Sequence, residues 1–521
     1  MIEVLQQPRM RLLQNKNFSE NFFIIIYLQH IADFPCLYFR GESMAKYRDQ
    51  KKPLFNLESG VFVAEGHPAR AVFFLVDSLN LIRFHRKFKN DRVGRKAYPV
   101  KSMIRVLIYA YLEGIYSNRR IEQYCNENLV YRYLCQDDPP DHSTISRFWK
   151  RFEKDIFSLF LQSIRAAQKY GLVDYKNIAG DGVRISSMGS RSMLFNLKNG
   201  VKKLNHLNKS GRNYSNKKFS FKAKLLKSMY KLKAAKKRPR PKGKEKQTYM
   251  HITEPEARLM KKRDIFISGY NAQVMVDSKN HIILSSFVTN HSFDTYNGIK
   301  LIKSTQKNIG NINISDSNIT LDKGYENEDL YKFATEEKLN LYAATKSPVR
   351  EKSTYQVKTH KSKFEPVYNK KRDAYICFRN HIIPYRRDKI VKGKMYAIYE
   401  RSCSPCNLKE ECIAAKRKRK VIARRLPDED ENHTIWKHKL EIMGSRIEMF
   451  RKMKTEAAKT IYSWRLLTVE PVFAQIEGNK FFRRFSVWGL SKVSAQWQFV
   501  CTVHNIGKII GYFNRMGIGL V

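Results

Sequence analysis

The sequence is poor in acidic residues and in cysteine for its length. Its 521 residues include 48 Asp and Glu against 98 Lys and Arg, which gives a formal net charge of +50 and a pI near 10.0. Eight cysteines are too few for a disulfide framework and favour a reducing compartment. The positive excess favours a polyanionic partner, because counterion release makes binding to nucleic acid strong and salt-dependent. From charge alone, ribosomal and membrane-surface partners stay open beside DNA.

The chain also lacks a long, clean hydrophobic run. The nearest candidate, residues 22–39, is interrupted by a histidine, an aspartate and a proline well short of a membrane span. No basic segment followed by a small-residue cleavage site flanks it, so a signal peptide is not expected. We predict no membrane partner and a location in a bacterial cytoplasm, at the nucleoid when bound. Residues 1–43 are predicted to be an extension of uncertain relevance, because Met44 opens a more natural N-terminus.

A chain of this length is expected to form two to four structural units. Residues 44–170 are predicted to be helical, with one helix capped by Ser102 and a second, unbroken helix beginning after Ser117. A third helix, from His142, carries an apolar stripe and a basic opposite face. The stripe consists of Ile145, Phe148, Trp149, Phe152 and Ile156, and the basic face of Arg147, Lys150 and Arg151. This pattern is compatible with helix-turn-helix DNA binding and equally with a helical bundle that has a solvated basic face.

The next region, residues 171–346, alternates short β-rich runs with helices. The order is three strands, a helix, a strand, a helix and a strand, which is typical of a ribonuclease-H-like α/β domain with a mixed sheet. The runs are residues 177–185, 270–277, 281–288, 295–307, 318–322, 327–338 and 339–345. In that topology the first and fourth strands are neighbours, so we expect Asp181 and Asp322 to lie close together.

Paired carboxylates would give a basic protein a means of phosphodiester chemistry. Two divalent cations about 3.5–4 Å apart can activate an oxygen nucleophile and neutralise the leaving oxygen. Such hard cations need carboxylate, water and phosphate oxygens as ligands. Asp181 and Asp322 are therefore candidate ligands. Taken alone, an aspartate in such a position is more often an ordinary turn or cap residue.

Five motifs in order carry a family resemblance: DHSTISRF, GDGVRIS, EPEARLMKKRDIFISGYNAQVMVD, LDKGYENE and a long C-terminal motif beginning YSWRLLTVEPVF. Together they resemble the DDE transposases of bacterial insertion sequences, in the branch with a helical N-terminal domain and a cysteine-bearing insertion before the last catalytic acid. The resemblance runs from about residue 44 to about residue 512. It implies a metal-dependent DNA transposase in which Asp181, Asp322 and Glu470 bind two Mg²⁺ or Mn²⁺ ions.

The resemblance also implies a reaction and partners. Water cuts the DNA at the terminal inverted repeats of the element, and the freed 3′-hydroxyl attacks target DNA without a covalent protein–DNA intermediate. Pairing two element ends implies a homo-oligomer on DNA. Glu470 has an alternative interpretation as a first-turn acid at a helix N-terminus, because Pro471 follows it.

The family's final motif contains a tyrosine, an arginine, the glutamate and, two helical turns on, a lysine. Tyr462 and Arg465 match the first two, and Arg465 is expected to hold a DNA phosphate by a bidentate contact. At the lysine position this sequence has Glu477. Lys480 is the nearest basic substitute, rotated by about 60° from that position on an ideal helix. This departure and the unusual N-terminus support one alternative, a catalytically inactive DNA-binding remnant. A separate alternative keeps the metal chemistry as a DDE nuclease without strand transfer.

Two insertions are predicted within the catalytic domain. The first is a basic arm, residues 190–265, which is expected to be partly helical and to contact the phosphate backbone without reading sequence. The second is residues 347–430, in which four cysteines can give a tetrahedral Zn²⁺ site, with free buried thiols as the alternative. The four are Cys377, Cys403, Cys406 and Cys412, and the basic run 416–420 beside them is a predicted DNA contact. Residues 431–521 complete the catalytic domain.

Several other polar and thiol residues are expected to be structural or solvated and not catalytic. They are Asp174, Asp277, Asp294 and His504, and the packing cysteines Cys36, Cys125, Cys135 and Cys501.

Overall fold

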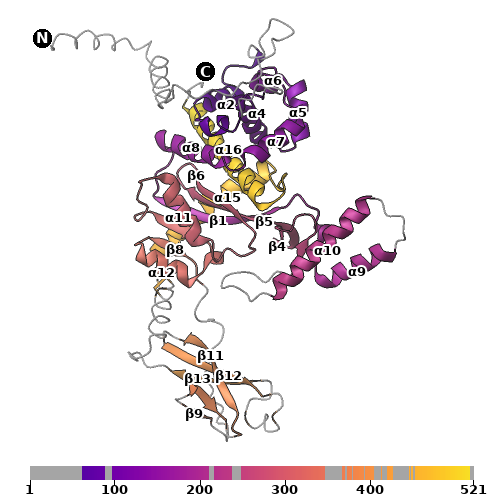
Figure 1. The fold of residues 1–521 in the computed structure, drawn as a ribbon. Helices are drawn as coiled ribbons and strands as arrows, with labels where there is room; N and C mark the ends of the chain where they lie inside the picture. The colour runs from indigo at the N-terminus through magenta and orange to yellow at the C-terminus, as the bar shows by residue number, and fades with distance from the viewer. Residues whose placement is uncertain are drawn as a thin grey trace, which may run out of the picture. The chain divides into compact units, whose positions relative to one another are not determined.

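The structure is a computed structural model, and its helices and strands fall into two compact units (Figure 1). Unit 1 contains residues 1–320 and 463–521, and unit 2 contains residues 321–462. The structure describes residues 62–88, 97–209, 216–237, 248–345, 366–369, 372–377, 379–391, 394–403, 406, 412, 419–425, 445, 448–449 and 452–516. The predicted extension, residues 1–43, and Cys36 lie outside these residues.

The N-terminal part of unit 1 is helical, as the apolar periodicity predicts. Its helices are α2 (Pro68–Asp77), α3 (Ile82–His85), α4 (Val100–Leu112), α5 (Asn118–Glu127), α6 (Leu129–Cys135), α7 (His142–Phe152) and α8 (Ile156–Lys169). Asp141 begins α7, because its Oδ1 accepts from the Thr144 N–H at 2.8 Å. The predicted apolar stripe on α7 and α8 is buried. The stripe prediction is therefore confirmed.

Two helix boundaries differ from the prediction. Ser102 does not cap α4, which already begins at Val100; the buried Ser102 hydroxyl instead donates to Gln136 Oε1 at 3.2 Å. The second predicted helix is two helices, α5 and α6. It breaks at Asn128 because the Asn128 side chain accepts from the backbone N–H groups of Val130 and Tyr131 and so begins a new helix.

A mixed sheet forms the centre of the chain, and its strand order is β4-β5-β1-β7-β8, with β6 also paired to β5. The strands are β1 (Asn177–Ser186), β4 (Arg258–Lys262), β5 (Ile265–Asp277), β6 (Ile283–Thr289), β7 (Asn318–Leu321) and β8 (Leu341–Ala343). β1 runs antiparallel to β5, with Asp181 opposite Val274. The boundary between the two units falls inside β7. The predicted strands and helices follow one another in the predicted order, with α11 (Gly298–Ile309) between β6 and β7, but the sheet also contains β4, whose residues the prediction assigned to the basic arm.

Two C-terminal helices follow, of which the first begins in unit 2 and enters unit 1 at Ser463. Helix α15 (Glu456–Phe473) contains Pro471, whose missing N–H cannot bond to the carbonyl four residues earlier, and it continues into a π-helix, η5 (Ala474–Asn479). Helix α16 (Leu490–Arg515) packs its apolar face on the sheet. Its buried Trp497 donates from Nε1 to the Gln273 carbonyl at 3.2 Å, which fixes α16 to the centre of β5.

The basic arm between β1 and β4 is ordered around a small core of its own. Helices α9 (Leu197–Lys209) and α10 (Asn216–Lys237) lie side by side and pack on the short strands β2 (Leu194–Phe195) and β3 (Met250–His251), beyond β4 in Figure 1. The core residues are Phe195, Leu225, Leu232, Met250 and Ile252. The prediction of a partly helical arm is therefore confirmed for its described residues.

Unit 2 begins at the end of β7. The short helix η3 (Lys323–Tyr325), helix α12 (Glu328–Glu336) and β8 follow. A separate five-stranded sheet has the order β13-β12-β11-β10-β9. Its strands are β9 (Val367–Asn369), β10 (Ala374–Ile376), β11 (Ile382–Val391), β12 (Lys394–Ser402) and β13 (Arg419–Arg425). Among the described helices of both units, none combines the length and the apolar character that crossing a membrane requires.

Candidate active site

Asp181 lies near the middle of β1, with its carboxylate held from two sides. Its Oδ1 accepts from the Gly182 N–H at 2.7 Å, and its Oδ2 forms an ion pair with Arg465 Nη1 at 3.0 Å. The two side chains are 24% and 11% exposed, respectively. An ion pair shielded to this degree is screened less by solvent than one at the surface. The arginine from α15 therefore balances the charge of the first candidate acid.

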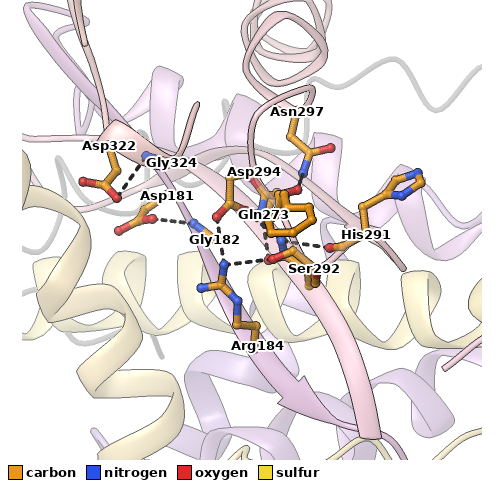
Figure 2. A network of polar contacts seen from close by, with 12 residues as sticks. Asp181, Gly182, Arg184, Gln273, His291, Ser292, Asp294, Asn297, Asp322 and Gly324 are labelled. Atoms are coloured by element: carbon orange, nitrogen blue, oxygen red, sulfur yellow. Dashed lines mark hydrogen bonds and ion pairs between the residues drawn. The ribbon is translucent and has the colours of Figure 1, made fainter. Parts of the chain in front are cut away.

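Gly182 lies against a buried polar cluster (Figure 2). Asp294 Oδ1 accepts from Asn271 Nδ2 and from Gln273 Nε2, each at 2.7 Å. A Cβ atom at position 182 would lie 2.1 Å from Gln273 Nε2 and 2.8 Å from Asp294 Oδ1. Glycine is therefore required next to Asp181 because three polar side chains approach the backbone there.

Arg184 joins this cluster from the same strand. One of its Nη atoms donates to Asp294 Oδ2 and to the Ser292 carbonyl, each at 3.1 Å (Figure 2). The Asp294 carboxylate thus balances a cation and accepts two amide N–H groups within a buried site. This agrees with the structural role predicted for Asp294. It also connects the loop before α11 to the strand that carries Asp181.

Asp322 follows the last residue of β7, a strand adjacent to β1 in the sheet order. It begins η3, where its Oδ2 accepts from the Gly324 N–H at 3.4 Å. Its cap geometry is that of an ordinary turn residue.

Glu470 lies in the last turns of α15, because the helix begins at Glu456. The alternative interpretation of Glu470 as a first-turn acid is therefore wrong. Its side chain is exposed, and it follows Arg465 by five residues, which corresponds to about 140° around a straight helix. Pro471 and the π-helix that follows interrupt the regular backbone beside it. π-Helical segments of this kind are frequent at functional sites.

The chemistry of the predicted metal ligands is that of hard oxygen donors, which suits Mg²⁺ or Mn²⁺. Within the described residues, no group of three or more His, Cys, Asp or Glu side chains is arranged to hold a metal ion. The roles of Asp181, Asp322 and Glu470 as joint ligands remain a prediction.

Glu477, at the position where a lysine was expected, has a basic partner. Its carboxylate forms an ion pair with the ammonium group of Lys262, the last residue of β4, and the side chains are 19% and 23% exposed. Arg483 Nε also donates to the Glu477 carbonyl at 3.0 Å. A cation is therefore present at this point of unit 1, but it comes from the strand rather than the helix.

Lys480, the predicted substitute, is held within the protein. Its Nζ donates to the Leu112 carbonyl at the end of α4 at 2.8 Å, and burial lowers its pKa to about 8. Tyr116 donates its hydroxyl to the Lys480 carbonyl at 2.8 Å. A contact of Lys480 with DNA would require the ammonium group to leave Leu112. Tyr462, the remaining residue of the motif, lies one turn before Arg465 in α15 and is half-buried.

The basic face of α7 is exposed, as predicted for Arg147, Lys150 and Arg151. Arg147 is oriented by its own helix, since its guanidinium donates to the Ser143 carbonyl at 3.3 Å and to Thr144 Oγ1 at 3.2 Å. The Arg151 guanidinium lies 4.9 Å from the centre of the Phe88 ring. These contacts hold the cations in place while leaving the face open to a partner.

The four cysteines of the insertion are free thiols, all partly exposed. The Cys406 N–H donates to the Cys403 carbonyl at 3.1 Å, which forms a turn, and Lys420 Nζ lies 3.5 Å from Cys412 Sγ. No three of these four described thiols form a group that could hold a metal ion. The zinc site stays a prediction. The basic run beside it is described only at residues 419 and 420.

Two features of unit 1 were not identified from the sequence as parts of the site. One is the pair formed by Lys262 and Glu477. The other is the polar pair Asn271 and Gln273, which alternate with apolar residues along β5 and point to one face. That alternation within an otherwise apolar strand was the available signal.

Two protein families match the chain. A transposase domain (DUF772) matches residues 58–151, a segment that includes the basic face of α7. A transposase DDE domain matches residues 376–510, a segment that includes Arg465, Glu470 and Glu477. No curated protein matches the chain.

Proposed function

We propose that this chain is a DDE transposase of the insertion-sequence type, which cuts DNA at the ends of its element and joins them to target DNA; the matches to a transposase domain and to a transposase DDE domain support this. The observation that carries the proposal is the ion pair between Asp181 and Arg465. It connects the acid of the central strand to the helix that holds Glu470, and that helix belongs to the matched DDE segment.

In the proposed reaction Asp181, Asp322 and Glu470 would be the ligands of two divalent cations at the DNA phosphate. The sheet order supports this arrangement, because the strand before Asp322 is the neighbour of the strand that carries Asp181. When bound, the metal ions would supply Lewis-acid activation of water and of the 3′-hydroxyl, and would neutralise the leaving oxygen. Neither the cleavage of the element end nor its joining to target DNA needs a covalent protein–DNA intermediate.

The protein's own residues orient these acids. The Gly182 N–H fixes one Asp181 oxygen, and the cluster of Arg184, Asp294 and Gln273 keeps the strand backbone in place behind it. Once the acids hold cations, Arg465 would be released from the Asp181 carboxylate and could bind a DNA phosphate instead. This would reconcile its observed ion pair with its predicted phosphate contact.

DNA recruitment is proposed to depend on the basic faces. Arg147, Lys150 and Arg151 on α7 are candidate contacts to the terminal repeats, and Lys480 remains a candidate near the site. The net charge of +50 favours such contacts at low salt. The same proposal includes a homo-oligomer that pairs two element ends, a bacterial cytoplasmic location and a structural zinc ion at the four cysteines.

A strand-transfer assay tests the proposal. Labelled duplexes carrying the terminal repeats that flank the gene are incubated with the full chain, target DNA and Mg²⁺. Joined products are expected from the unchanged protein and none from Asp181→Asn. Asp316→Asn, in the loop before β7, is the matched control and should retain activity. Nicked DNA without joined products would mean that the protein is a nuclease and not a transposase. Binding without cleavage would mean that it is a DNA-binding remnant.

A further inference from the structure

Helix α10 of the basic arm presents an exposed face that the catalytic proposal does not use. One side of the helix packs Leu225, Ser228 and Leu232 into the arm. The opposite side exposes three lysines with two large apolar residues beside them. They are Lys224, Lys227 and Lys231, with Leu226 and Tyr230.

The lysines lie on one side of the helix because of their spacing. Lys224, Lys227 and Lys231 follow one another at intervals of three and four residues, so they form a row along the axis. The row rises by about 10 Å on an ideal helix. From Ser187 to Lys244 the sequence contains no acidic residue. Within that stretch the sequence therefore places no carboxylate beside these cations, and the nearest acid along the chain is Glu245.

Among the described residues of the arm, Tyr230 is the most exposed large apolar residue. Its side chain is 76% exposed, and Leu226, one turn earlier on the same side, is 44% exposed. Single exposed apolar residues are common on protein surfaces. Here, however, an aromatic ring lies directly beside a row of cations on a helix whose own core is already filled.

We propose that this face binds a DNA strand with unpaired bases at the element end, with the lysines on its phosphates and the Tyr230 ring stacked on a base. The proposal rests on the proposed function, which supplies the DNA ends. Lysine rows complement a phosphate backbone, and every base has a face on which an aromatic ring can stack. A closed duplex hides those faces, so a bare duplex would use the lysines alone.

The test measures binding of two labelled DNA probes by the full chain without divalent metal. One probe is a blunt duplex, and the other has the same duplex with a short unpaired fork. Tyr230→Ala should weaken binding to the forked probe by about fivefold to 100-fold and leave the blunt duplex unchanged. Tyr230→Phe should bind as the unchanged protein does, because the ring is retained.

The lysines are tested by the salt dependence. The double variant K227Q/K231Q should lower the slope of log affinity against log salt by about 1 to 2 on either probe. Lys332→Gln on α12 is the matched control and should not change it. Equal loss on both probes for Tyr230→Ala, or no loss on either, would overturn the proposal.

The same variants separate this inference from the catalytic one. Asp181→Asn should bind the forked probe normally, because it lies outside the arm. If the unchanged chain binds forked DNA through Tyr230 but never cleaves, the catalytic proposal fails and the arm proposal stands. Thermal unfolding of each variant confirms folding, which the exposed position of Tyr230 should leave unaltered.

Discussion

Arg465 Nη1 lies 3.0 Å from Asp181 Oδ2, although 284 positions separate the two residues in the sequence. The arginine is the more buried partner, at 11% exposure. A cation therefore already occupies one oxygen of the carboxylate that the proposed mechanism assigns to metal. The Arg465 guanidinium and a divalent ion would therefore compete for that oxygen.

This competition gives the first prediction. Arg465→Gln should bind Mn²⁺ more tightly than the unchanged protein in the absence of DNA, by about threefold to tenfold, since a partly shielded ion pair contributes on the order of 1 kcal/mol. The free Mn²⁺ signal in electron paramagnetic resonance measures it. Lys459→Gln removes an exposed cation from the same helix and serves as the control. Unchanged affinity in Arg465→Gln would mean that the pair is structural only.

The sequence could predict the strands but not this pair. The alternation of strands and helices and the position of Asp181 on the first strand follow from local apolar patterns. The partner of Asp181 depends on how a helix near the C-terminus packs on the sheet, which no local pattern encodes. Arg465 was expected to contact DNA because the family motif assigns it that role. The motif does not say which residue Arg465 contacts when metal and DNA are absent.

The second prediction concerns Gly182. Gly182→Ala should lower the melting temperature, because its Cβ would meet Gln273 Nε2 at 2.1 Å and two further polar atoms below 3.0 Å. Overpacking of a buried site costs about 1–3 kcal/mol. Gly478→Ala, where nothing lies within 4 Å, is the matched control and should be neutral or slightly stabilising. Equal melting temperatures for both variants would show that the polar cluster yields easily.

The prediction for Lys480 is a dependence on pH. Burial lowers its pKa to about 8 from an ordinary value of 10.5, so the unfolded chain holds a proton between these values that the folded protein has lost. The stability cost of the buried ammonium is present below pH 8 and disappears as the pH rises to about 10.5. Lys480→Met should raise the melting temperature at pH 7. It should also abolish the gain in stability that the unchanged protein shows as the pH rises from about 8 to 10.5. Lys459→Met, at an exposed site, should follow the unchanged protein.

The misplaced helix boundaries have a common physical cause. Ser102 and Asn128 are both residue types that can cap a helix, and the sequence does not say which of them is used. Asn128 is used because its side chain accepts from two N–H groups of the next helix. Ser102 is not, because its hydroxyl is turned to Gln136 inside the helical part of unit 1.

The last prediction concerns the ion pair of Lys262 and Glu477, which places a cation beside the position where the family motif has a lysine. Glu477→Lys alone places two ammonium groups together and should lower stability. Lys262→Glu alone should do the same with two carboxylates. The exchanged double variant should recover most of the loss, with a coupling of about 0.5–3 kcal/mol in the double-mutant cycle.

Strand cleavage by the double variant then decides whether the position of the cation matters. Recovery of stability together with higher cleavage would assign the lysine a role on the helix. Equal cleavage would assign the pair to packing of β4 against the π-helix. Additive losses would contradict the pair itself.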